Sequence, residues 1–208
     1  MVPAARPKVR FAVMYHVPMA IAVTETLLTA EEFYCLPDPP QGGKMELIRG
    51  KVVTHMPVSG KHGKRQVQIA RALDEFLDGR RLAEVAVETG FIIRRDPDLV
   101  LAPDVSVTPV DRLPGGQLPE DSFVDGVPSI AVEVVSPGDS EARVMAKVGE
   151  YLEAGVDRVW IVRARTQTVV VFRSGGDVEQ LGPGARLTSD HAALPEPGFV
   201  LEVNSLFA

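Results

Sequence analysis

The chain has 208 residues, a length that suits a single domain built around one buried core. Its composition is 45% hydrophobic and 24% charged, as in globular proteins, and no apolar run reaches the roughly eighteen residues that a membrane span requires. The net charge of −6 argues against a protein that attracts nucleic acid through its overall charge.

The first 26 residues are expected to form a leader, and residues 27–208 are expected to form one domain. Basic residues precede an apolar stretch at residues 11–23, which is the order found in a secretory signal. His16 and Pro18 interrupt that stretch. We therefore expect a poorly ordered leader or an over-extended start rather than a secretory signal.

The folded domain is predicted to begin with a short helix that ends by Leu36. Thr29 and Glu32 have the spacing of a capping box, in which each side chain accepts a hydrogen bond from the backbone of the other residue. Cys35 is the only cysteine, which excludes an internal disulfide and a thiolate zinc site. This cysteine usage favours a reducing, cytoplasmic location.

A basic segment follows the first helix. Residues 45–54 read as two strands that turn at Arg49-Gly50, and residues 60–78 form an amphipathic helix, because apolar residues recur there at three- and four-residue spacing. Between Lys44 and Leu73, Glu46 is the only acid. The segment is either a solvated helix face or a strip that binds phosphate. Its candidate nucleic-acid contacts at the start of the helix are Lys61, Lys64 and Arg65.

The rest of the chain is rich in predicted strands. The predicted strands cover residues 85–94, 100–107, 130–135, 158–163 and 168–173, with a long loop at 109–128 and a second helix at 140–154. Helix, strands, helix and strands in this order predict an α/β fold with a mixed central β-sheet flanked by helices.

Two of these strands each carry one acid. Asp104 and Glu133 lie in short apolar strands, where a charged group that is buried alone is costly. Two carboxylates close together also repel, and a divalent cation between them removes that penalty. Two carboxylates from neighbouring strands, together with a lysine, suffice to hold Mg²⁺ and cut a phosphodiester. The alternative is that both are ordinary strand-end residues.

Lys147 is the candidate lysine. Glu133 lies about 10 Å from the strand end at Ser136, given the rise of a strand. Lys147 lies about 10 Å along the next helix from Ser140. If this helix folds back along the strand, Lys147 returns to the depth of Glu133. Its ammonium then either reaches inward or extends outward over apolar surface.

Together these motifs resemble the PD-(D/E)XK nuclease superfamily and, more narrowly, its Uma-type family of restriction-endonuclease-like proteins. The resemblance runs from about residue 27 to the end of the chain. One departure is that Val135 stands where the superfamily motif has its lysine, and the Uma-type family moves this lysine onto the following helix. The matching stretches include Glu46-Leu-Ile-Arg-Gly50, Ala102-Pro-Asp-Val105, Val132-Glu-Val-Val-Ser-Pro137, Lys147 and Val159-Trp-Ile-Val162.

The resemblance implies a restriction-endonuclease-like core with a metal site. Asp104 and Glu133 would coordinate Mg²⁺ or Mn²⁺, together with a main-chain carbonyl near Val134, and Lys147 would orient or help deprotonate the attacking water. Glu46 is either a further ligand or base, or a surface acid on an edge strand. His62 either contacts phosphate or is an ordinary polar residue at a helix start.

The leading hypothesis is therefore a Mg²⁺-dependent endonuclease that acts on DNA. The alternative is a catalytically inactive nucleic-acid-binding or interaction protein with the same fold, which the acidic balance and the displaced lysine favour. Two cuts on one duplex would require a homodimer, although no segment identifies an interface. The four histidines, His16, His55, His62 and His191, lack the spacing of zinc ligands.

Overall fold

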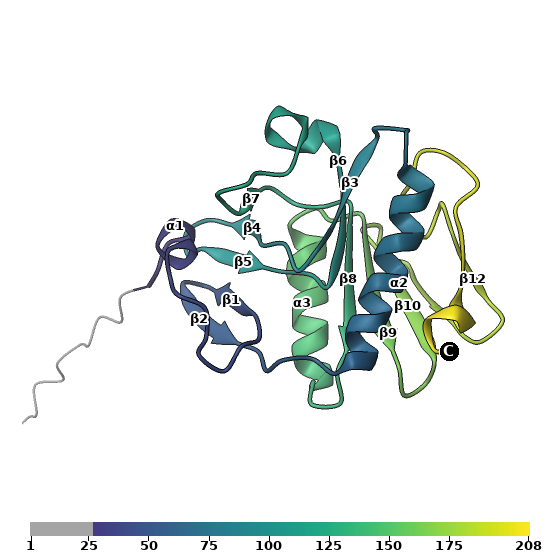
Figure 1. Ribbon diagram of the computed structural model, residues 1–208, viewed down its shortest axis with the longest axis horizontal. Coiled ribbons are helices and arrows are strands. Elements are labelled where there is room, and N and C mark those ends of the chain that lie inside the picture. Colours follow the sequence, from purple (N-terminus) through teal and green to yellow (C-terminus); the bar gives the residue numbers. More distant parts are fainter. Residues whose placement is uncertain (1–26) are drawn as a thin grey trace, which may run out of the picture.

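The computed structural model describes residues 27–208, so the predicted leader lies outside the described residues (Figure 1). The helices in this part are α1 (Ala30–Tyr34), α2 (Gly60–Leu77) and α3 (Glu141–Glu153). The strands are β1 (Met45–Ile48), β2 (Lys51–Thr54), β3 (Ala83–Val87), β4 (Phe91–Arg94), β5 (Leu99–Leu101), β6 (Val105–Pro109), β7 (Val124–Asp125), β8 (Ile130–Val135), β9 (Arg158–Arg163), β10 (Thr168–Arg173), β11 (Val178–Leu181), β12 (Arg186–Thr188) and β13 (Val200–Glu202). None of these helices is both long enough and apolar enough to cross a membrane.

The central element is a six-stranded sheet with the strand order β11-β10-β9-β8-β6-β3. Strands β8 and β9 are parallel, whereas the other neighbouring pairs are antiparallel. The predicted mixed sheet is thus confirmed. The parallel pair needs a crossover connection, which α3 supplies between β8 and β9.

Helices α2 and α3 cover opposite faces of this sheet (Figure 1). Alternate residues of β8 point to opposite faces, so each helix packs on its own set of strand residues. The core on the α2 side includes Ile69, Leu73, Val105, Val132 and Trp160. The core on the α3 side includes Val144, Val148, Tyr151, Ala131 and Ile161. The helical periodicity therefore predicts the buried face of α2 correctly.

A second sheet has five strands in the order β2-β1-β5-β4-β7. Its residues Phe91 and Leu101 share a core with α3, and its residues Leu47 and Val100 pack against α1. Helix α3 therefore lies between the two sheets. The predicted long loop at 109–128 contributes β7 to the second sheet, and it also forms short 3₁₀ turns.

The predicted strands at 85–94 and 100–107 are each wrong as single strands, because both break where the chain passes from one sheet to the other. β3 pairs with β6 in the six-stranded sheet, and β4 pairs with β5 in the five-stranded sheet. Glu88 interrupts the first strand with a positive φ of 55°, and Gly90 lies so close to the Phe123 ring that a Cβ at this position would clash with it. Pro103 interrupts the second strand, since it has no N–H to donate.

The predicted capping box at α1 is present and gives a test of the fold. Thr29 Oγ1 accepts a hydrogen bond from the Glu32 N–H at 3.2 Å, and Glu32 Oε2 accepts one from the Thr29 N–H at 2.9 Å. We expect Thr29→Ala to lower the free energy of unfolding by about 1 kcal/mol in urea denaturation, because a helix N–H loses its partner. Ser174→Ala, at an exposed residue, is the control and should change it by less than about 0.5 kcal/mol. Equal effects of the two substitutions would contradict this role of Thr29.

Candidate functional site

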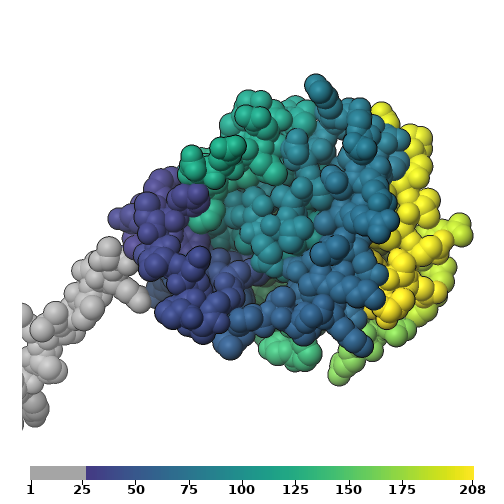
Figure 2. Space-filling model, in the orientation of Figure 1, coloured from purple at the N-terminus to yellow at the C-terminus, as the bar shows by residue number. Residues whose placement is uncertain are grey.

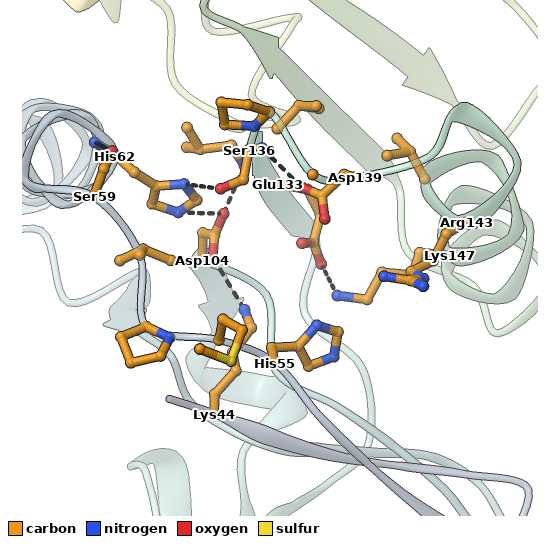
Figure 3. A pocket seen from close by; sticks show the side chains of 18 of the residues that line it. Lys44, His55, Ser59, His62, Asp104, Glu133, Ser136, Asp139, Arg143 and Lys147 are labelled. Carbon is orange, nitrogen blue, oxygen red and sulfur yellow. Dashed lines mark hydrogen bonds and ion pairs between the residues drawn. The ribbon is translucent and has the colours of Figure 1, made fainter. Parts of the chain in front are cut away.

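Side chains from both sheets, α2 and α3 meet in a cavity of about 470 Å³ at the junction of the two sheets (Figure 3). Of the predicted site residues, His62, Asp104, Glu133 and Lys147 line it, whereas Glu46 does not. The residues that line the cavity include Lys44, His55, His62, Asp104, Glu133, Ser136, Asp139, Arg143 and Lys147. The predicted convergence of Asp104, Glu133 and Lys147 is therefore present in the structure.

Asp104 lies at the break between β5 and β6 and is held on both oxygens. Its Oδ1 accepts hydrogen bonds from Lys44 Nζ at 3.0 Å and from Gln66 Nε2 at 3.1 Å. Its Oδ2 accepts one from the Val134 N–H at 2.6 Å, and His62 Nε2 lies 3.1 Å from the same oxygen. Burial would raise the pKa of Asp104, but His62, the Lys44 ammonium and the Val134 N–H hold it well below its ordinary value. Asp104 is thus a fixed carboxylate.

Glu133 points toward α3, as the alternation along β8 predicts. Lys147 Nζ donates to its Oε1 at 2.8 Å, and the hydroxyl of Tyr151 donates to the same oxygen at 2.9 Å. The other oxygen, Oε2, accepts no hydrogen bond from the described residues. Burial raises the pKa of Glu133, and the charges of Asp104 and Glu46 act in the same direction. Of these acids, Glu133 is the one that is least stabilised in its charged form.

Lys147 points inward, which decides between the two orientations left open by the sequence. Besides Glu133, its ammonium contacts Glu46 Oε1 at 2.9 Å, and only 14% of its side chain is exposed. Burial would lower the pKa of Lys147, but the two carboxylates raise it above its ordinary value. The lysine is therefore a buried cation shared by one acid from each sheet.

Glu46 is buried rather than a surface acid on an edge strand, so that alternative is wrong. Its side chain is 1% exposed, and β1 lies between β2 and β5. Its carboxylate also accepts a hydrogen bond from the Ala102 N–H at 3.0 Å and lies 2.8 Å from His55 Nε2. Burial would raise the pKa of Glu46, but Lys147 and His55 lower it.

Lys44 and Glu88 complete the site, and neither is predicted by the sequence reasoning. Lys44 Nζ donates to the Ala102 carbonyl at 2.8 Å and to Asp104, and it lies 3.3 Å from Glu88 Oε2. Burial would lower the pKa of Lys44, but the surrounding carboxylates, led by Glu133, raise it. Lys44 precedes Glu46 by two residues in a strand-like stretch, and this spacing could have indicated a shared face. Glu88 has no comparable signal.

His62 lies inside the site. Ser59 caps α2 and places His62 in its first turn, where Nδ1 lies 3.1 Å from Ser136 Oγ. His62 also contacts Asp104, and only 7% of its side chain is exposed. His62 thus lines the cavity and is not merely a polar residue at a helix start.

The other predicted nucleic-acid contacts do not line the cavity. Lys64 Nζ donates to the Ala208 carbonyl at 2.9 Å, and the Arg65 guanidinium lies over the Phe207 ring at 5.5 Å. Figure 2 shows the C-terminal segment, in yellow, lying against α2, in blue. Lys61 is exposed at the start of α2. Lys61, Lys64 and Arg65 therefore lie outside the cavity that Asp104 and Glu133 line.

The carboxylate oxygens of the site fit a divalent cation, although they do not form a complete set of metal ligands. Among residues 27–208, no three His, Cys, Asp or Glu side chains are grouped to hold a metal ion. Instead, Lys44 and Lys147 lie among the carboxylates of Glu46, Glu88, Asp104 and Glu133, so this cluster has two negative charges in excess. Of the four acids, Asp104 and Glu133 line the cavity, where Arg143 and Asp139 balance each other. Carboxylate oxygens that border an open cavity are the ligands that Mg²⁺ prefers.

Comparisons with known proteins match the chain to a family and to a solved structure that are described as putative nucleases. Residues 30–205 match the family model described as "Uma2: Putative restriction endonuclease". A solved structure, titled as a putative nuclease belonging to DUF820 from Anabaena variabilis, is 26% identical to the chain and has a TM-score of 0.67. The match covers 86% of this chain and 97% of the other. No curated protein matches the chain.

Proposed function

The chain belongs to the Uma2 family of putative restriction endonucleases, and from this premise we propose that it is a metal-dependent endonuclease that hydrolyses phosphodiester bonds in DNA. The observation that carries the proposal is that Asp104 and Glu133 line one cavity, within a cluster of four carboxylates and two lysines that has two negative charges in excess. A phosphodiester is an anion, so this cavity would repel it unless a cation neutralises the acids. One divalent ion does so.

Asp104 and Glu133 are the proposed ligands for Mg²⁺ or Mn²⁺. The pairing of Val105 with Val132 would place Asp104 opposite Glu133 if it continued by one residue, and Oε2 of Glu133 is available. A main-chain carbonyl near Val134 would supply a neutral oxygen. The chemistry that the metal supplies when bound is polarisation of the scissile phosphate and a lowered pKa of a bound water.

Lys147 would position the attacking water and stabilise negative charge on the phosphate. An ammonium has three N–H donors, and Glu133 and Glu46 use two of them, which leaves one for water or a phosphate oxygen. Tyr151 fixes Oε1 of Glu133, and His55 and the Ala102 N–H fix Glu46. These contacts hold the lysine in place and so reduce the reorganisation that the reaction requires.

The second candidate is a catalytically inactive protein that binds nucleic acid with this fold. The observation that favours it is that both lysines already pair with the acids, which stabilises the site without a metal. The two functions differ in one measurable respect. An endonuclease cuts DNA, whereas an inactive relative binds it and leaves it intact.

We expect the full chain to nick supercoiled plasmid in the presence of Mg²⁺ or Mn²⁺, and we expect EDTA to reduce cleavage to the level of the buffer. A panel of single-stranded, double-stranded and branched DNA, with RNA for comparison, would define the substrate. A gel-shift assay in Ca²⁺ would measure binding separately from cleavage. Binding without cleavage of any substrate would support the second candidate.

A further inference from the structure

The ammonium of Lys44 is surrounded by oxygen atoms in the way that a metal ion would be. Its neighbours are the Ala102 carbonyl at 2.8 Å, Asp104 Oδ1 at 3.0 Å and Glu88 Oε2 at 3.3 Å. Two carboxylates and a main-chain carbonyl are typical ligands of hard divalent cations. We propose that Lys44 takes the place of a second metal ion, so that the site binds a single divalent cation. This inference rests on the proposed function.

Asp104 links the two positions. Two-metal nucleases hold their ions about 4 Å apart, so at least one carboxylate commonly contacts both. Asp104 contacts Lys44 directly and is also a proposed ligand of the divalent ion. The Lys44 ammonium therefore lies where the second metal ion of a two-metal site would lie. Its positive charge is part of the side chain and cannot dissociate as a metal ion can.

Lys44 and Lys147 differ in how their donors are used. Lys44 has three oxygen neighbours, which matches the three N–H groups of an ammonium, whereas Lys147 has two. Lys44 consequently has no donor left for a water molecule or a phosphate. Its contribution is a fixed charge, while Lys147 retains the capacity to contact the substrate.

The charges of the site also indicate one ion. The two negative charges in excess are neutralised by one divalent cation. A second ion would bring two further positive charges next to the Lys44 ammonium, where repulsion at a few ångströms is strong in a partly buried site. Removing Lys44 would take away this repulsion and leave three oxygens without a cation.

The test is the number of Mn²⁺ ions that the full chain binds, measured by calorimetry and by electron paramagnetic resonance. We expect the wild-type protein to bind one equivalent and Lys44→Ala to bind two, the second more weakly. Glu88→Gln, which removes a charged neighbour of Lys44 but keeps the ammonium, is the matched control and should still bind one. Lys44→Ala combined with Glu88→Gln should return to one, since the second ion loses a ligand.

Each outcome separates this inference from the proposed function. Two equivalents in the wild-type protein, or one in folded Lys44→Ala, would overturn the role of Lys44 and leave the metal-dependent function standing. No Mn²⁺ binding by the wild-type protein would overturn the proposed function itself. If circular dichroism shows that Lys44→Ala does not fold, Lys44→Gln replaces it, because its amide keeps a hydrogen bond but lacks the charge. One equivalent in folded Lys44→Gln would then overturn the inference.

Discussion

Replacing Asp104 by asparagine should lower the rate of DNA cleavage by about 10³-fold, which is the loss seen when a group that stabilises transition-state charge is removed. The amide keeps the size of the carboxylate but loses its charge and one of its two acceptor oxygens. Asp104 accepts hydrogen bonds from Lys44, Gln66 and the Val134 N–H. An amide nitrogen would oppose at least one of these donors. The measurement is the initial rate of plasmid nicking at saturating Mg²⁺.

Asp98→Asn is the matched control for this experiment. Asp98 also accepts hydrogen bonds from backbone N–H groups, those of Ala30 and Asp96, and its side chain is 11% exposed, but it lies outside the cavity. The Asp98→Asn variant should lose about as much stability as Asp104→Asn, about 1–3 kcal/mol in the free energy of unfolding. It should retain the wild-type nicking rate. Undiminished cleavage by Asp104→Asn would contradict the assignment of Asp104 as a metal ligand.

Replacing Lys147 by methionine should lower the free energy of unfolding by about 3–5 kcal/mol at neutral pH, as expected when one partner of a buried ion pair is removed. Glu46 and Glu133 would remain in the site without their shared cation. Cleavage should also fall by at least about 100-fold at saturating Mg²⁺, because the donor to the water or phosphate is lost. Urea denaturation and the nicking assay measure the two effects on the same preparation.

The stability loss of Lys147→Met should depend on pH with a definite sign. The pKa of Glu133 is already raised in the folded protein, and removing Lys147 raises it further. Between the ordinary carboxyl pKa and this raised value, the folded state binds more protons than the unfolded state, so stability falls as pH rises. The deficit relative to the wild-type protein should therefore be larger at about pH 8 than at about pH 5.

Two further variants test the interpretation of that loss. Arg71→Met breaks an exposed ion pair with Glu75 and should cost less than about 1 kcal/mol. Lys147→Met combined with Glu46→Gln should recover part of the stability, because one uncompensated charge is removed with its partner. A loss that is equal in Lys147→Met and Arg71→Met would mean that Lys147 does not act as a buried counter-ion.

Much of the site could be predicted from the sequence, because it depends on local periodicity. Alternation along β8 places Glu133 on the face opposite Val132, and the rise of a strand and a helix brings Lys147 back to the same depth. These relations involve short stretches with regular geometry. Tyr151 follows Lys147 by four residues and shares its helix face, so the same reasoning could have found it.

The remaining contacts could not be predicted, because they depend on how the two sheets meet. Lys44 reaches Asp104 across 60 residues, and Gln66 reaches it across 38 residues. Both contacts follow from the break in the strand at Pro103, which the apolar pattern of residues 100–107 conceals. The same pattern hides the break at Glu88, since a residue with positive φ leaves the hydrophobic alternation on either side intact.

The chain passes from the six-stranded sheet to the five-stranded sheet after β3 and returns before β6, which has a consequence for how this molecule tolerates change. Glu46 belongs to the second sheet and Glu133 to the first, and the ion pairs through Lys147 tie them together. Neither half of the domain could keep these ion pairs if it were excised or replaced. Grafting of either sheet onto another scaffold would transfer acids without their counter-ions, so the smallest transplantable unit is the whole domain.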